Sequence, residues 1–106
     1  MTELTSSEQL DEVFRLPLAV LFKHSPRCPI SRTARAEVER FIREAPKVPV
    51  YWVDVIQHSP VSRLIAERAA IRHESPQVIV LREGAVVWHA SHSGVTRAAL
   101  RDHLTA

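Results

Sequence analysis

The sequence lacks most of the features that stabilise small secreted proteins or anchor proteins in membranes. Its 106 residues include one cysteine and two glycines, so no internal disulfide framework can form. Its apolar runs stop well short of the ~18 residues that would span a bilayer. Residues 1–9 are polar and acidic and contain no apolar stretch of a targeting signal. We therefore expect a protein of the reducing cytoplasm.

A large charge of one sign is also missing. The 14 basic and 12 acidic residues give a net charge of +2 and an isoelectric point near 9.2. This excess is too small and too evenly spread to favour a nucleic-acid partner. With 45% hydrophobic residues, the chain is long enough for one core but too short for two. A single globular domain covering residues 1–106 is expected.

The first half of the chain alternates helical and strand patterns. Capping-box signals at residues 5–9 predict a short helix that ends before Pro17. Leu18–Phe22 is a continuous apolar run, typical of a central strand covered on both faces. Apolar residues then recur at helical spacing over 34–45, before a β-rich segment at Val50–Val55. Strand, helix and strand at this spacing predict a right-handed βαβ unit.

The second half predicts a helix, a hairpin and a final helix. Serine followed by proline at the N-cap and first helical positions predicts a helix over Ser59–Ala70. Two apolar segments, Val78–Leu81 and Val86–His89, flank a tight turn at 82–84 and predict a hairpin. The last helix is expected over Val95–Leu104. The order α-β-α-β-α-β-β-α is that of the thioredoxin-like fold, an α/β domain with a four-stranded mixed central sheet flanked by helices.

The only cysteine lies where a strand gives way to a helix. Pro29 suits the first turn of a helix, so Cys28 is expected at the helix N-terminus. Free backbone N–H groups and the helix dipole there favour a thiolate over a thiol. Nearby side chains add positive charge: Lys23, Arg27, Arg32 and, when protonated, His24. The alternative is a buried, inert cysteine that only fills space.

Four stretches of the chain together resemble one known family. They are FKHSPRCPIS (Phe22–Ser31), YWVDVI (Tyr51–Ile56), RHESPQVIVL (Arg72–Leu81) and WHASHSG (Trp88–Gly94). The combination resembles the monothiol bacilliredoxins of the YtxJ family, which act in the bacillithiol redox system. Two departures concern substrate preference: Pro26 stands where a small hydroxyl residue is more usual, and Ser93–Gly94 replaces a bulkier aromatic step.

The resemblance implies where the site lies. In that fold the strands follow the spatial order 50–55, 18–22, 78–81 and 86–89, with the last two antiparallel to the central pair. Cys28, residues 73–76 and residues 89–94 would then share one edge of the sheet. The resemblance further implies a cis bond before Pro76, whose neighbouring backbone would pair with whatever is disulfide-bonded to Cys28.

The resemblance also implies the chemistry and the residues that perform it. Cys28 would remove bacillithiol from S-bacillithiolated proteins, and a second bacillithiol molecule would release it, because Ser31 replaces a resolving cysteine. Client proteins and bacillithiol, as a thiol co-substrate, are the expected partners. The catalytic residues would be Cys28, Ser31 and Pro76. The residues expected to contact the substrate or thiol are Lys23, Arg27, Pro29, His73, Glu74, Ser75, His92, Ser93 and Gly94.

Several of these assignments have simpler alternatives. Ser31 either donates to the thiolate or is an ordinary helix-start hydroxyl. His73 and Glu74 either line the groove or belong to a surface loop. Two histidines spaced as His89 and His92, without further ligands, make a poor zinc site, so no metal is expected. Residues 92–94 are expected at a helix N-terminus whose N–H groups hold a carboxylate of the thiol.

Two other function classes are compatible with the sequence. One is a thioredoxin-fold adaptor that binds peptides without redox turnover, with Cys28 as a vestigial residue. The other is a thiol peroxidase, suggested by Ser25-x-x-Cys28, although the chain is short for that family and lacks its proline-led peroxide motif. Formation of a single bacillithiol adduct on Cys28 would distinguish the first class from the oxidoreductase, and consumption of peroxide would identify the second.

Overall fold

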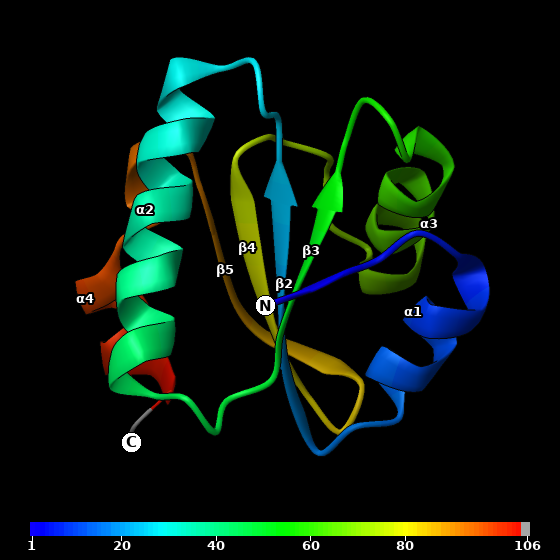
Figure 1. Cartoon of the computed structure of the whole chain (residues 1–106). Helices are drawn as coiled ribbons and strands as arrows, with labels where there is room; N and C mark the ends of the chain where they lie inside the picture. Colours follow the sequence, from blue (N-terminus) through cyan, green and yellow to red (C-terminus); the bar gives the residue numbers. More distant parts are fainter. Residues whose placement is uncertain (105–106) are drawn as a thin grey trace.

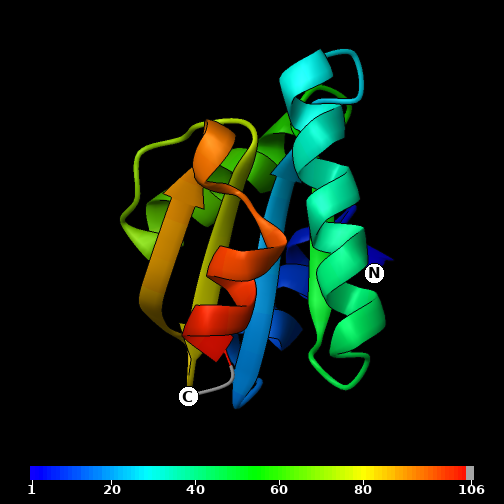
Figure 2. The ribbon, with the colours of Figure 1, turned by 90° about the vertical axis from the view of Figure 1, so that its left-hand side faces the viewer.

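Within the part of the chain that the structure describes, five strands form one mixed sheet with two helices on each face. The computed structural model describes residues 1–104. The sheet has the order β1-β3-β2-β4-β5, with α2 and α4 on one face and α1 and α3 on the other (Figure 1). Figure 2 looks onto the face that α2 and α4 cover. In chain order the elements are β1 (Thr2–Glu3), α1 (Ser7–Phe14), β2 (Leu18–His24), α2 (Pro29–Glu44), β3 (Val50–Asp54), α3 (Ser59–Ala69), β4 (Gln77–Arg82), β5 (Ala85–Ser91), the 3₁₀ turn η1 (His92–Gly94) and α4 (Arg97–Leu104).

The thioredoxin-like order and the spatial order of the four predicted strands are confirmed, but the number of strands and the expected direction of the last strand are not. β4 runs antiparallel to β2 as expected, whereas β5 runs parallel to β2, because the hairpin after β4 reverses the chain again. A fifth strand, β1, pairs in parallel with the outer edge of β3, where Leu4 N–H donates to the Trp52 carbonyl (2.8 Å). The expectation of four strands was wrong because a two-residue polar strand carries no hydrophobic periodicity. Its pairing depends on the exposed edge of β3 and not on its own side chains.

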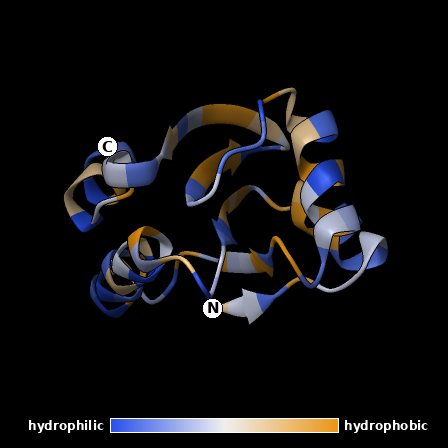
Figure 3. Cartoon of the chain, turned by 90° about the horizontal axis from the view of Figure 1, so that it is seen from above, coloured by the Kyte–Doolittle hydropathy of each residue, from blue (hydrophilic) through white to orange (hydrophobic). Residues whose placement is uncertain are grey.

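The central strand β2 is buried on both faces, as its apolar run predicts. Val20 and Phe22 face a core formed with α2 and α4, whereas Ala19 and Leu21 face a second core formed with α1 and α3. Seen from above, the strands between the helices carry much of the apolar colour (Figure 3). Two cores on one sheet fix the register of β2, because a slip by one residue would exchange the sets of side chains. The end of β2 is therefore firmly placed.

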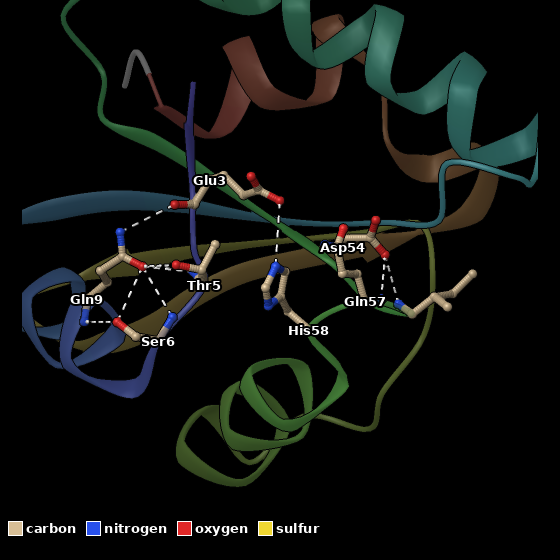
Figure 4. A network of polar contacts seen from close by, with 8 residues as sticks. Glu3, Thr5, Ser6, Gln9, Asp54, Gln57 and His58 are labelled. Carbon is tan, nitrogen blue, oxygen red and sulfur yellow. Dashed lines mark hydrogen bonds and ion pairs between the residues drawn. The ribbon is translucent and has the colours of Figure 1, made fainter.

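Helix ends agree with the predictions in α1 and differ in α3 and α4. The side chains of Ser6 and Gln9 form a capping box before α1 (Figure 4). In α3 the N-cap is His58, so Ser59 is already the first helical residue. The last α-helix begins at Arg97 instead of Val95, because the Thr96 hydroxyl accepts the Ala99 N–H (3.1 Å) and sets the start.

The ends of three strands meet at one edge of the sheet. Lys23 near the end of β2 pairs with Gln77 at the start of β4, which in turn pairs with Ser91 at the end of β5. This register confirms the predicted edge. It brings the loop after β2, the loop before β4 and the loop after β5 together, although they are far apart in sequence.

The predicted hairpin turn closes β4 onto β5 with two residues of positive φ. Glu83 has φ 51° and Gly84 has φ 75°, as a two-residue type I′ turn requires. A Cβ on Gly84 would lie 2.7 Å from the Phe14 carbonyl oxygen, which is backbone and cannot move aside. Glycine at this position thus serves both the turn and the approach of α1.

We expect Gly84→Ala to lower the free energy of unfolding by roughly 1–3 kcal/mol, through left-handed strain and the contact with Phe14. Urea denaturation would measure it. Gly94→Ala is the matched control, because a Cβ there meets the Ala90 Cβ at an ordinary 3.4 Å. Equal losses in the two variants would contradict this explanation.

A buried lysine lies on the α3 face of the sheet. Lys23 is 0% exposed, and its Nζ lies 3.0 Å from Nδ1 of His73, which also lies 3.4 Å from the Ser62 hydroxyl. Burial lowers the pKa of Lys23 to about 8. Burial, and then the charge of Lys23, lower the pKa of His73, while Glu74 acts in the opposite direction. The charged lysine therefore destabilises the fold below pH 8.

Stability should rise with pH between about 8 and 10.5, because the unfolded chain then binds the Lys23 proton and the folded chain does not. Lys23→Met removes this term. The free energy of unfolding of the variant should exceed that of the wild type below this range. The difference should fall by about 2 kcal/mol as the pH rises through it, after allowance for solvent screening. Urea titrations at several pH values test this. The exposed Lys47→Met is the control, and a pH-independent effect of Lys23→Met would refute the assignment.

Candidate active site

Cys28 is the N-cap residue of α2, as the sequence predicts. Its extended backbone (φ −95°, ψ 122°) leads into Pro29 in the first turn, and the first turn of α2 holds no acidic residue. The Cys28 side chain makes no capping hydrogen bond and is partly exposed. The sulfur therefore lies at the positive end of a 16-residue helix, accessible to a substrate and free to accept hydrogen bonds.

Ser31 is buried beneath this sulfur-bearing turn, within the junction of β2 and α2. Its exposure is 0%, and its hydroxyl accepts the Ser25 N–H (2.9 Å). The same oxygen lies 2.8 Å from Nδ1 of His24. Cys28 N–H in turn donates to the Ser25 carbonyl (3.1 Å). Ser31 therefore fixes the loop that carries Cys28, whichever of its predicted roles it has toward the sulfur.

His24 does not supply the positive charge considered for it in the sequence. Its ring stacks on Phe22 (centroids 5.5 Å apart) and meets the edge of Trp52 (5.9 Å). Burial, and then the charge of Arg35, lower the pKa of His24, against the opposing effects of Asp54, Glu39 and Ser31. A neutral imidazole results at physiological pH, and it serves as a hydrogen-bonding group of the junction.

The loop before β4 has the predicted cis peptide bond between Ser75 and Pro76. The Pro76 carbonyl accepts the His92 N–H (2.9 Å), which ties this loop to the loop after β5. The Ser75 hydroxyl oxygen is buried and has no hydrogen-bond partner among the residues that the structure describes. Both loops lie at the edge of the sheet above which α2 begins (Figure 1).

The other residues proposed for substrate binding occupy different environments. Lys23 lies inside the fold with its ammonium against His73, so the ammonium is not displayed to a substrate, whereas His73 itself is exposed. Glu74 lies on the surface, and a hydrogen bond with Ser91 lowers its pKa, with smaller contributions from His92, Arg72 and His89. Glu74 is therefore a carboxylate among cationic or titratable neighbours.

The expectation that residues 92–94 lie at the start of the last α-helix is wrong. They form the separate 3₁₀ turn η1, which opens with His92 at φ 54° and precedes α4 by two residues. Residues 92–94 therefore do not supply the N–H groups of an α-helix start that were expected to hold a carboxylate of the thiol. Instead, His92 and Ser93 line an open, mostly apolar hollow of about 320 Å³ whose other walls are Ile30, Thr33, Ala34, Glu37, Val95 and Thr96.

A second hollow lies on the other side of the Cys28 loop. It measures about 220 Å³ and is lined by Pro26, Arg27, Asp54, Ile56 and Gln57. Asp54 shapes it, because one carboxylate oxygen accepts the N–H groups of Ile56 and Gln57 at 2.9 Å each (Figure 4). Ile30 in the first hollow is 57% exposed and Ile56 in the second is 59% exposed. Apolar surface therefore flanks the cysteine on both sides.

Sequence reasoning missed the hydrogen bond between His24 and Ser31 and the two exposed isoleucines. The strand pattern offered one signal: a histidine that continues the buried Phe22 face of β2 needs a polar partner. The isoleucines carried no such signal, since single exposed apolar residues are common on protein surfaces.

Residues 1–104, which the structure describes, offer neither a metal centre nor a membrane-spanning helix. No group of three or more His, Cys, Asp or Glu side chains comes together there as metal ligands. None of the helices in that part of the chain is long and apolar enough to cross a membrane.

Solved structures with the same fold include several redox proteins. A protein assigned as an oxidoreductase with a thioredoxin fold matches at TM-score 0.91 with 29% identity, over 96% of this chain and 91% of that chain. Thioredoxin of Fasciola hepatica matches at TM-score 0.76 with 22% identity, over 99% and 97% of the two chains. Thioredoxin of Trypanosoma brucei brucei gives 0.80 and 21%, over 100% and 92%. At these identities the two thioredoxins show the fold alone.

The family comparison agrees with the geometry of the site. Residues 2–100 match the family model described as "Monothiol bacilliredoxin BrxC". That match spans every element from β1 to the middle of α4, including Cys28, Ser31 and Pro76. A thiol oxidoreductase role follows from the family and from the single accessible cysteine at a helix N-terminus. The chain belongs to the monothiol bacilliredoxin family.

Proposed function

We propose that this protein removes bacillithiol from S-bacillithiolated proteins by thiol–disulfide exchange at Cys28. The observation that carries the proposal is the position of the only cysteine: it is the N-cap of α2, partly exposed and without a capping bond. Ser31 occupies the place of a resolving thiol and is buried. With one sulfur at the site, exchange needs external thiols for completion.

The first step transfers the bacillithiol group to the protein. The Cys28 thiolate attacks the bacillithiol sulfur of the client disulfide, forming a new S–S bond as the old one breaks. The client cysteine leaves as a thiolate and takes a proton from water. Attack on that sulfur leaves the client in its reduced form, so the protein itself holds the small thiol.

The second step regenerates Cys28 at the expense of another bacillithiol molecule. Its thiolate attacks the bacillithiol sulfur bound to Cys28, so that Cys28 leaves as a thiolate. The products are bacillithiol disulfide and the starting enzyme. Bacillithiol supplies both electrons for reduction of the client and is therefore a co-substrate, and the protein needs no resident metal for either step.

The edge loops would position these reactants. The backbone around Pro76 pairs with the polypeptide or thiol that is joined to Cys28, in the manner of an added strand. His92 and Ser93 on one side, and Arg27 on the other, offer polar groups at the two hollows beside the sulfur. Pro29 keeps the start of α2 free of an N–H that would need a partner.

A defined substrate tests the proposal directly. A protein with one S-bacillithiolated cysteine is incubated with the reduced chain, first without and then with free bacillithiol. Mass spectrometry should show one bacillithiol adduct on Cys28 in the first case and its removal in the second. A chain that binds the substrate protein yet acquires no adduct would favour the peptide-binding adaptor instead.

We expect Cys28→Ser to reduce transfer of bacillithiol to the uncatalysed rate while leaving the melting temperature nearly unchanged, because the replacement is almost isosteric. Adduct formation by mass spectrometry measures the first effect and thermal denaturation the second. Ser31→Ala is the matched control: it keeps the sulfur and should still acquire the adduct. Residual transfer by Cys28→Ser would exclude the mechanism.

Ser31→Cys should place a second thiol at the C-x-x-C spacing of dithiol enzymes. After mild oxidation the variant should lose both free thiols and gain one intramolecular disulfide, measured by thiol titration and intact mass. It should then reduce clients with less dependence on free bacillithiol. Two free thiols that persist under strong oxidant would contradict the placement of Ser31 beside Cys28.

A further inference from the structure

The Ser31 hydroxyl has a single proton to donate. The oxygen already accepts the Ser25 N–H (2.9 Å) and lies 2.8 Å from Nδ1 of His24. Its position is N3 of α2, three residues after the N-cap Cys28, and side chains three positions apart lie on the same side of a helix. The proton of Ser31 can therefore go to the histidine nitrogen or to the sulfur, but not to both.

The histidine tautomer decides between these acceptors. A neutral ring protonated at Nε2 offers Nδ1 as an acceptor and takes the Ser31 proton. A ring protonated at Nδ1 donates to the Ser31 oxygen, which then has accepted two bonds and has its own proton free for sulfur. The Ser31 hydroxyl is fully buried, so water cannot substitute for either partner without opening the junction.

We propose that His24 changes its tautomer when Cys28 ionises, and that it thereby directs the Ser31 hydroxyl to the sulfur. In the thiol state Ser31 donates to Nδ1, because a thiol is a weak acceptor. In the thiolate state Nδ1–H donates to Ser31, and Ser31 donates to the sulfur anion. One proton leaves Cys28 for solvent, while the ring loses a proton at Nε2 and gains one at Nδ1. His24 is a positioning residue that acts through Ser31.

The groups that face the ring favour a neutral state in both forms. Arg35 and Glu39 approach from α2, and Asp54 approaches from β3, so charges of both signs surround the imidazole. The ring also lies between Phe22 and Trp52. Burial disfavours an imidazolium, so the ring can answer ionisation of the sulfur by relocating a proton but not by holding an additional one.

This inference deepens the proposed function, since it concerns how the same Cys28 thiolate is stabilised. It does not depend on bacillithiol. A chain that transfers bacillithiol with a fixed His24 tautomer would refute the inference and leave the function intact. A chain in which the His24 tautomer changes as Cys28 ionises, but in which no bacillithiol adduct forms, would refute the proposed function and leave the inference intact.

The experiment is an NMR titration of the full chain labelled with ¹⁵N in its histidine rings. The chemical shifts of Nδ1 and Nε2 report directly which nitrogen carries the proton. We expect the Nδ1–H fraction of His24 to rise from minor to major over the pH interval in which thiolate absorbance appears, with the same midpoint. His103 is an internal reference, because its Nδ1 is held 2.8 Å from the Ala99 carbonyl.

Two variants show whether sulfur and serine are the cause. In Cys28→Ala the His24 tautomer should not change over this pH interval. In Ser31→Ala the thiol should still titrate, but His24 should no longer follow it. A constant His24 tautomer in the wild-type chain, or the same change in Cys28→Ala, would overturn the proposal.

A kinetic test separates this role from a merely structural one. His24→Phe keeps a ring against Phe22 but removes the competing acceptor, so Ser31 should donate to sulfur permanently. Alkylation of Cys28 at a pH where thiol predominates should then be roughly two- to tenfold faster than in wild type, and in Ser31→Ala slower by a similar factor. If His24 only supported the loop, both variants would be slower, and that result would refute the proposal.

Discussion

The requirement that buried polar groups have partners governs the junction between β2 and α2. The chain leaves a fully buried strand, turns over four residues and begins a helix whose first residue is a proline. The Ser25 N–H and the His24 ring are enclosed in this turn, and the Ser31 hydroxyl serves both. Because one oxygen satisfies two buried groups, the sulfur of Cys28 need not take part, and its lone pairs remain available for chemistry.

The register of the sheet brings the remaining parts of the site to that junction. Lys23, Gln77 and Ser91 are paired across three strands, so the loops beyond them lie side by side at one edge. The Pro76 carbonyl bonded to the His92 N–H joins two of those loops into one surface. The two cores that fix β2 therefore also fix the distance between the cysteine and its surroundings, since no loop can slide without changing strand pairing.

The sequence predicted what depends on local patterns, and it failed where distant partners decide. Cys28 followed by proline was sufficient to place the start of α2, and the strand order followed from the resemblance. The edge strand β1 and the η1 turn could not be predicted, because β1 depends on an unpaired edge of β3 and η1 on the carbonyl of Pro76. The contact of His24 with Ser31 crosses from strand to helix, and no periodicity encodes such a pair.

The hydrogen bonds of Ser31 with Ser25 and His24 also disfavour a second cysteine at position 31. A cysteine at position 31 would replace a strong acceptor by a weak one, leaving the Ser25 N–H and the His24 nitrogen poorly satisfied in a buried place. Closing a disulfide would further draw that side chain away from both. A hydroxyl at position 31 therefore stabilises the junction more than a thiol would. Under the proposed function, a site of this kind relies on a thiol from solution to release whatever Cys28 has bound.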